Sequence, residues 1–198
     1  MQNKILSSGI SQLQLTMSNE AQEKLLAYLH LLQKWNHAYN LTAITDFDKM
    51  ITYHLLDSLS IAPFILGNNI VDVGSGAGLP GIPLAIYFPE KQFTLMDSIG
   101  KKTRFIAQAV RELQLKNVQV VQTRAEEYQS KNAFDTMTAR AVASIDDLVK
   151  ISRELLQDNG KLLMMKADVS AEELEKYPLT CEKLSVPGID GERCLIIL

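Results

Sequence analysis

The sequence predicts an α/β fold, with a mostly parallel seven-stranded sheet, helices on both faces and a helical N-terminal extension. Two observations support this. From residue 69 onward, short apolar segments alternate with helix-like segments, as in parallel sheets with crossover helices. Before that point, apolar residues recur every three or four positions, the spacing of amphipathic helices. We therefore expect residues 1–66 to form the extension and residues 67–198 to form one compact core.

The composition is that of a globular protein. Of the 198 residues, 46% are hydrophobic and 22% are charged, which suffices for a sizeable core. No apolar run has the length of a membrane-spanning helix, and the N-terminus lacks the apolar segment of a signal peptide. We expect a cytoplasmic protein that does not bind membranes. Cys181 and Cys194 lie outside any CxxC motif and are expected to be reduced thiols.

Two helices are expected in the extension. Ser18 or Asn19 can cap the first, which should run to about Tyr39 with one apolar stripe. The second should run over 47–66. It carries His54, Asp57 and Ser58 on one face, which we interpret as a polar cluster on the helix surface, near the active-site mouth, rather than a hydrolase triad.

The alternation that follows supplies the elements of the core. An Asp-Asn-Gly turn at 158–160 should lead into the fifth strand, and a Pro-Gly turn at 187–191 should make the last strand antiparallel. The expected strands are Ile70–Val73, Gln92–Met96, Val118–Val121, Phe134–Thr138, Lys161–Met165, Leu179–Val186 and Cys194–Leu198. The expected helices are Leu79–Phe88, Lys101–Leu115, Ile145–Leu156 and Ser170–Lys176.

A glycine-rich loop follows the first core strand, with Gly74, Gly76 and Gly78 in a GxGxG pattern. Glycine allows a tight turn and close approach of a ligand to the backbone. The spacing differs from the GxGxxG of dinucleotide-binding loops, which disfavours a nicotinamide cofactor. S-adenosylmethionine has no phosphate and fits better, with Asp72 facing its ammonium group directly or through water. A purely structural turn is the alternative.

Two further loops should lie at the same edge of the sheet. Asp97 ends the second strand, where a carboxylate can accept both ribose hydroxyls, cap the next helix, or do both. After the third strand, backbone N–H groups near Ala125 and Glu126 could reach an adenine ring, and a carboxylate could accept from its amine. Solvated acids at a helix start are the alternative interpretation.

The fourth strand ends at Thr138-Ala139-Arg140-Ala141, which offers no base or nucleophile at neutral pH. In Rossmann-like methyltransferases the methyl acceptor lies here. Guanine N7 has a lone pair and no proton, so its methylation needs positioning more than acid–base groups. We expect Arg140 to be the catalytic residue, holding a guanine edge, the cofactor carboxylate or an RNA phosphate. His30 and His37 have no ligand-spaced partners, so no metal is expected.

Five segments together resemble the glucose-inhibited division protein B family, ribosomal RNA small subunit methyltransferase G. They occur in order within residues 30–166, and the glycine loop with its Leu-Pro-Gly-Ile-Pro extension is the most specific. The segments are Leu41–Ile44, His54–Leu59, Asp72–Pro83, Asp97–Phe105 and Thr138–Ala141.

The resemblance implies a Rossmann-like class I methyltransferase that methylates N7 of a guanine in the decoding-region loop of 16S rRNA, guanine 527 in customary numbering. S-adenosyl-L-methionine would be the cofactor and S-adenosyl-L-homocysteine the product. The family's pattern implies cofactor contacts at Gly74, Leu79, Ala125, Glu126 and Arg140. It also implies a monomer that acts on 16S rRNA or on a small-subunit particle.

The charge distribution bears on the RNA partner. The net charge is −3, yet basic residues outnumber acidic ones between residues 91 and 166, which suits local binding of a polyanion or is ordinary surface variation. The cations expected to touch phosphate are Lys101, Lys102, Arg104, Arg124 and Arg140. A small-molecule or protein methyltransferase, and a catalytically silent RNA-binding assembly factor, stay open as alternatives.

Overall fold

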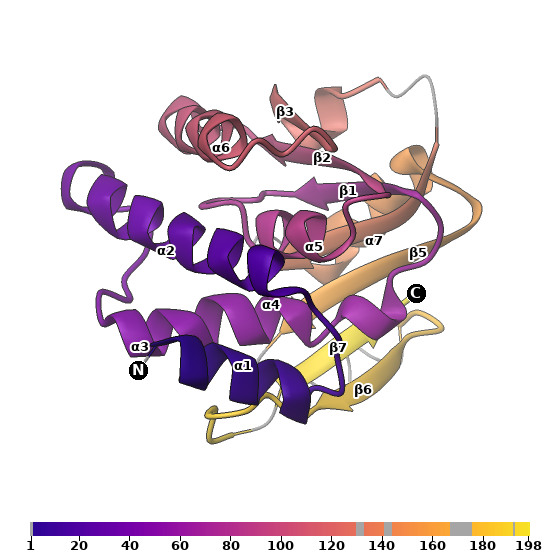
Figure 1. The fold of residues 1–198 in the computed structure, drawn as a ribbon. Helices are drawn as coiled ribbons and strands as arrows, with labels where there is room; N and C mark the ends of the chain where they lie inside the picture. The colour runs from indigo at the N-terminus through magenta and orange to yellow at the C-terminus, as the bar shows by residue number, and fades with distance from the viewer. Residues whose placement is uncertain (1, 130–132, 141–143, 167–175, 192) are drawn as a thin grey trace.

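A seven-stranded sheet with the order β3-β2-β1-β4-β5-β7-β6 forms the centre of the computed structural model (Figure 1). The structure describes residues 2–129, 133–140, 144–166, 176–191 and 193–198. Strands β1 to β5 pair in parallel, and β7 is antiparallel to both β5 and β6, as predicted. The strands are β1 Asn69–Val73, β2 Gln92–Asp97, β3 Val118–Gln122, β4 Phe134–Arg140, β5 Leu156–Lys166, β6 Thr180–Leu184 and β7 Arg193–Ile197.

Helices cover both faces of the sheet and create two hydrophobic cores. Helices α5 (Gly81–Tyr87) and α6 (Gly100–Glu112) share one core with the N-terminal helices, whereas α7 (Ile145–Leu155) packs on the opposite face (Figure 1). Helix α5 starts two residues later than predicted, after the cis peptide bond between Leu79 and Pro80. The expected two-sided α/β architecture is confirmed.

The N-terminal extension holds one helix more than the sequence indicated. Helix α2 (Asn19–Tyr39) begins after Ser18, whose side chain accepts from the Ala21 N–H, as expected. Helix α1 (Gln2–Gln12) was not predicted, because its serines and Gly9 are weak helix formers. A Cβ on Gly9 would lie 2.3 Å from Leu56 Cδ1, so glycine allows the close approach that packing demands.

The predicted helix over residues 47–66 is interrupted. It consists of α3 (Phe47–Met50), a π-helical segment η1 (Ile51–Leu56), α4 (Asp57–Leu59) and a separate 3-10 turn η2 (Ala62–Phe64). The prediction of one regular helix was therefore wrong. A π-helical segment, or π-turn, cannot be recognised from the spacing of hydrophobic residues, and such segments often lie at functional sites.

The C-terminal part differs from the prediction in two details. The turn expected at 158–160 lies inside β5, where the pairing register with β4 shifts between Phe134 and Thr136. The helix expected over 170–176 falls largely on residues 167–175, which lie outside the described residues. Within the described part of the chain, no helix has the length and apolarity needed to cross a membrane.

Cys181 on β6 and Cys194 on β7 are joined as a disulfide, with their Cα atoms 5.8 Å apart. The expectation of reduced thiols is therefore wrong for this structure. Cys181 pairs with Ile196 and Cys194 with Lys183, so the cysteines are diagonal neighbours across the strand pair. Strand register creates this proximity, and the spacing of the cysteines in the sequence does not reveal it.

Candidate active site

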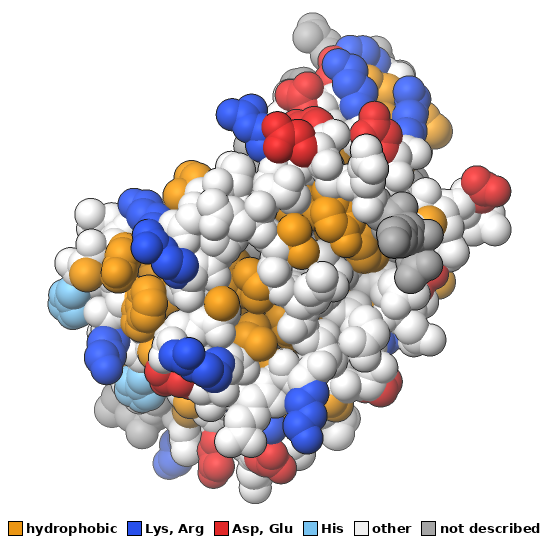
Figure 2. Space-filling model, turned by 90° about the horizontal axis from the view of Figure 1, so that it is seen from above, with side chains coloured by type: hydrophobic (Ala, Val, Ile, Leu, Met, Phe, Trp, Pro, Cys, Tyr) orange, Lys and Arg blue, Asp and Glu red, His pale blue; other side chains and the backbone are white. Residues whose placement is uncertain are grey.

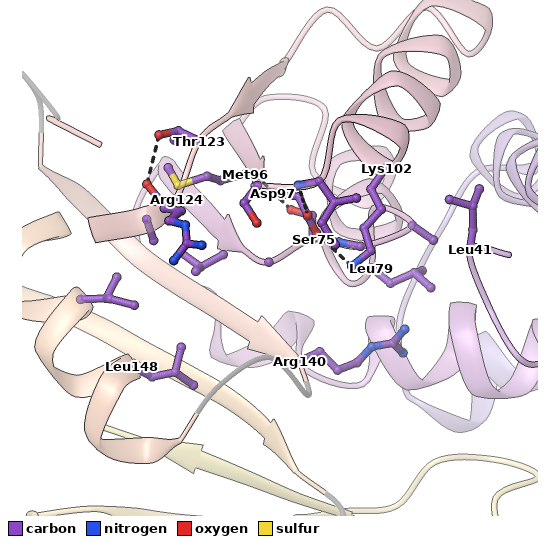
Figure 3. Close-up of a pocket in the computed structure, with 18 of the residues that line it drawn as sticks. Leu41, Ser75, Leu79, Met96, Asp97, Lys102, Thr123, Arg124, Arg140 and Leu148 are labelled. Carbon is purple, nitrogen blue, oxygen red and sulfur yellow. Dashed lines mark hydrogen bonds and ion pairs between the residues drawn. The ribbon is translucent and has the colours of Figure 1, made fainter. Parts of the chain in front are cut away.

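A cavity of about 570 Å³ opens at the carboxyl ends of the central strands, where the strand order reverses around β1. Ligands bind at this position in open α/β sheets. Its walls are the loop after β1, the ends of β2 and β4, the segment after β3, and a group from the N-terminal extension (Figure 3). The four loops that the sequence singled out therefore meet at one place.

The glycine loop presents its backbone to this cavity. Gly74 and Gly76 line the wall with positive φ of 67° and 60°. A Cβ on Gly76 would meet only the Gly74 carbonyl oxygen, at 3.9 Å, so the space beside it is open. Gly78 does not line the wall, because its Cβ position lies 2.6 Å from Ile82 and faces the core. Leu79 is buried and lines the wall.

Asp72 supports the loop from beneath. Its side chain is fully buried and is not part of the cavity wall. One carboxylate oxygen accepts from the Gly81 N–H at 3.2 Å, and the other accepts from the Thr138 hydroxyl at 2.9 Å. Burial raises the pKa of Asp72 to about 6, against the hydrogen bonds it accepts and the Arg140 charge. The Asp72 carboxylate thus joins β1, the start of α5 and β4.

Asp97 holds the same loop from the side and does reach the cavity. Its Oδ2 accepts from the Gly76 N–H at 3.0 Å, and its Oδ1 accepts from the Ile99 N–H at 2.9 Å. Lys102 Nζ lies 3.5 Å from Oδ2. Each carboxylate oxygen has further acceptor capacity. Asp97 can therefore order the loop and bind a ligand hydroxyl at the same time. It does not cap α6, the other role that the sequence allowed, because Ile99 is the residue before the helix and no side chain caps it.

The segment after β3 forms the far wall. Ala125 begins the 3-10 turn η3 (Ala125–Glu127) and is buried, whereas Glu126 is exposed, and both line the cavity. The structure thus places both residues at the cavity wall, with the Ala125 carbonyl already accepting from the Tyr128 N–H.

Arg140 occupies the opposite end of the cavity, next to Leu41, Thr42 and His54. In Figure 3 its side chain extends from the end of β4, away from Arg124. The Thr42 hydroxyl lies 2.9 Å from His54 Nε2, and no described residue bonds to the buried Nδ1. Thr42 and His54 were not among the predicted site residues, although both stand in segments that carried the family resemblance.

The His54, Asp57 and Ser58 side chains are buried, so their interpretation as a surface cluster was wrong. They form no Ser–His–Asp chain. The Ser58 hydroxyl donates to the His54 carbonyl at 2.5 Å, and Asp57 pairs with Arg140. Burial lowers the pKa of His54 to about 4, and the Arg140 charge acts in the same direction. His54 is therefore neutral at physiological pH and a weak base.

The cations proposed for phosphate contact have different environments. Lys101 donates to the Tyr39 carbonyl at 2.9 Å, and Lys102 pairs with Asp97. Arg104 and Arg124 are exposed, and Arg124 also lines the cavity. Among the described residues there is no group of three or more potential metal ligands.

Asp72 and His54 generate a pH prediction, because their shifts oppose each other. In the unfolded chain His54 becomes protonated below its usual pKa of 6.5, whereas in the folded protein its pKa is about 4 and it stays neutral. Acidification through this range therefore lowers the free energy of unfolding. In the folded protein Asp72 becomes protonated at its raised pKa of about 6, whereas in the unfolded chain its pKa is 3.8. Acidification through this range therefore raises the free energy of unfolding. Between these limits the two contributions largely cancel.

Asp72→Asn removes the compensating group. Its unfolding free energy should fall more steeply than that of the wild type between pH 6 and 4.5, by a further ~2 kcal/mol. Urea denaturation across this range measures the difference in slope, which does not depend on the absolute stability of the variant. If the unfolding free energies of the variant and the wild type changed in parallel with pH, the raised pKa of Asp72 would be contradicted.

Comparison with known proteins identifies the family. The family model for rRNA small subunit methyltransferase G matches residues 21–191. A relative with the name ribosomal RNA small subunit methyltransferase G, from Stutzerimonas stutzeri (strain A1501), is 48% identical over 200 residues, which cover 98% of this chain and 93% of the relative.

Solved structures agree on the fold. The ribosomal protein L11 methylase from Lactobacillus delbrueckii subsp. bulgaricus aligns with a TM-score of 0.58 at 17% identity, over 72% of this chain and 76% of that chain. Aeropyrum pernix fibrillarin, solved with natively bound S-adenosyl-L-methionine, aligns with a TM-score of 0.53 at 17% identity, over 68% of this chain and 67% of that chain. The predicted Rossmann-like class I methyltransferase fold is confirmed. The chain belongs to the rRNA small subunit methyltransferase G family.

Proposed function

We propose that this protein transfers a methyl group from S-adenosyl-L-methionine to N7 of a guanine in the decoding-region loop of 16S rRNA, guanine 527 in customary numbering. One observation carries the proposal beyond the family name. The cavity joins a glycine-lined end to an end that holds Arg140, Thr42 and a neutral His54 of low basicity. We call the end with Arg140, Thr42 and His54 the acceptor end, because the methyl acceptor would bind there. With no effective base, it suits an acceptor atom that attacks without losing a proton.

The residues at the glycine-lined end fit the cofactor. Gly74, Gly76 and Leu79 leave backbone and open space for the amino-acid part, and Asp97 has acceptor capacity for ribose hydroxyls. Ala125 and Glu126 flank the position proposed for the adenine. Asp72 and Gly78 act from beneath, so any effect of the Asp72 charge on the cofactor ammonium is indirect or through water.

When bound, the cofactor supplies a methyl group on a sulfonium: the bond from carbon to guanine N7 forms as the bond to sulfur breaks, leaving S-adenosyl-L-homocysteine. Guanine N7 carries no proton, so the protein need not remove one. A donor from Arg140 placed on N7 would block the attacking lone pair, so we infer that the guanidinium contacts the cofactor carboxylate or a phosphate instead. The neutral His54 adds no charge that would repel the cationic product.

Gly76→Asp tests the cofactor end. The carboxylate would enter the open space beside Gly76, and we expect S-adenosyl-L-methionine affinity to fall about 100-fold or more. Calorimetry of the purified protein measures this. Gly191→Asp is the matched control, because Gly191 also has a positive φ, of 124°, and its Cβ position has no neighbour within 4 Å. Wild-type affinity in Gly76→Asp would refute the placement.

RNA binding has to rest on local cations near the cavity. On the face drawn in Figure 2, basic side chains alternate with acidic and apolar ones and do not gather into one broad patch. Arg104 is exposed in the first turns of α6, which begins beside the cavity, whereas Arg111 is exposed at the distal end of the same helix. The two arginines therefore make a matched pair.

Arg104→Gln should weaken binding to 16S rRNA and lower the slope of log K against log salt by about 1, the loss of one phosphate contact. Arg111→Gln should leave the slope unchanged. Filter binding over a salt series compares the variants. Equal slopes for Arg104→Gln and the wild type would place the RNA on another surface.

The function itself is tested by incubating the protein with labelled S-adenosyl-L-methionine and 16S rRNA, or small-subunit particles, from cells that lack the enzyme. Label at N7 of guanine 527 is the expected result. Label only on a small molecule or a protein would favour a methyltransferase with that kind of substrate. RNA binding without cofactor affinity would favour a catalytically silent assembly factor.

We further propose that the protein acts as a cytoplasmic monomer.

A further inference from the structure

Asp57 is a buried carboxylate held between two arginines from distant parts of the chain. Its Oδ2 lies 3.2 Å from Arg140 Nη1, and its Oδ1 lies 3.3 Å from Arg193 Nε. Only 8% of the Asp57 side chain is exposed. Burying an ion pair costs desolvation energy that its attraction often fails to recover, so stability alone is a weak reason for such a cluster. Orientation of a functional cation is a better one.

The pairing fixes one corner of the Arg140 guanidinium. Nη1 donates to Asp57 Oδ2 and to the Tyr53 carbonyl, both at 3.2 Å, which uses both of its hydrogens. A guanidinium has five N–H groups, so three are left, on Nε and Nη2. Among the described residues, none accepts from these three. Arg140 lines the cavity at the acceptor end. Its Nε–Nη2 edge, which has no partner among the described residues, can therefore donate two parallel hydrogen bonds to a ligand there.

The π-turn makes this arrangement available. In a regular α-helix the Asp57 N–H would bond to the Tyr53 carbonyl. Here it bonds to the His54 and Thr52 carbonyls, and the Tyr53 carbonyl accepts from Arg140. Tyr53 lies in η1 and Asp57 follows it directly, so the backbone acceptor and the side-chain acceptor of Nη1 come from adjoining parts of one interrupted helix.

We propose that Asp57 is a positioning residue that aims the Nε–Nη2 edge of Arg140 at an oxyanion in the cavity. The inference rests on the proposed function. A guanidinium edge matches a carboxylate or a phosphate in a bidentate manner. The oxyanion is the carboxylate of the cofactor or a phosphate of the target RNA, and the two sources affect different constants. Arg193 serves to neutralise and hold Asp57, which also joins β7 to the acceptor end.

Asp57→Asn keeps the size of the side chain and removes its charge. Guanidinium resonances of the ligand-free protein report the aim directly. In the wild type, Arg140 should show restricted rotation about its Nε–Cζ bond, and in Asp57→Asn this restriction should be lost. Asp48→Asn is the matched control, because Asp48 is exposed on α3, in the same interrupted helix, and the partners of Arg140 and Arg193 among the described residues are Tyr53 and Asp57.

Kinetics give the functional arm. Asp57→Asn should lower kcat/KM for rRNA methylation about 10- to 100-fold, because a small misplacement near the reacting groups has effects of that size. A raised Kd for S-adenosyl-L-methionine identifies the carboxylate as the oxyanion. A raised KM for rRNA at unchanged cofactor Kd identifies the phosphate.

The inference is overturned if Arg140 stays restricted in Asp57→Asn, or if Arg140 is released while kcat, KM and Kd stay within twofold of the wild type. If the single variant unfolds, Asp57→Asn/Arg193→Gln removes one charge of each sign and is compared with Arg193→Gln alone. A wild-type protein that fails to methylate 16S rRNA would refute the proposed function, whereas the guanidinium spectra would still report on Asp57.

Discussion

Two carboxylates fix the glycine loop and the helix that follows it: Asp97 accepts from the Gly76 N–H within the loop, and Asp72 accepts from the Gly81 N–H where α5 begins. Positive φ values at Gly74, Gly76 and Gly78 give the loop its shape, and that shape needs fixed partners because glycine is the most flexible residue. The Tyr28 hydroxyl adds a bond of 2.6 Å to the Ala77 carbonyl from α2. The cavity wall is therefore organised by buried groups, of which Asp97 belongs to the wall whereas Asp72 and Tyr28 lie behind it.

The N-terminal extension contributes to the cavity wall as well as to the core. Leu41, Thr42 and His54 line the cavity beside Arg140, and the two acceptors of the Arg140 guanidinium come from Tyr53 in η1 and from Asp57, the residue that follows η1. At one end of the cavity, carboxylates order a neutral backbone. At the other, a carboxylate and a carbonyl order a cation beside an imidazole that burial keeps neutral. The acceptor end thus combines one fixed positive charge with no effective base.

Much of this arrangement could be predicted from the sequence, because it depends on local patterns. Strand–helix alternation placed the ends of β1, β2, β3 and β4 at one edge, and that placed Gly76, Asp97, Ala125 and Arg140 in one cavity. The rest depends on contacts between distant segments. Helix α1 exists because Leu6 and Ile10 find a core, despite poor helix formers between them.

The same limit explains the errors around residue 57. Helical spacing put Asp57 and Ser58 on one face, but whether that face is solvated depends on β4 and β7, which bring Arg140 and Arg193 to the carboxylate. The π-helical segment η1 is likewise not revealed by hydrophobic spacing, and the disulfide between Cys181 and Cys194 depends on the pairing register of β6 and β7.

Amide hydrogen exchange in the ligand-free protein tests the central claim most directly, since it reads the Gly76 and Gly81 N–H groups that the two carboxylates bind. Both amides should exchange slowly in the wild type. Asp97→Asn should release Gly76 selectively, and Asp72→Asn should release Gly81. Exchange of both amides at the rate of an unstructured chain before any ligand binds would contradict a loop preformed by its carboxylates.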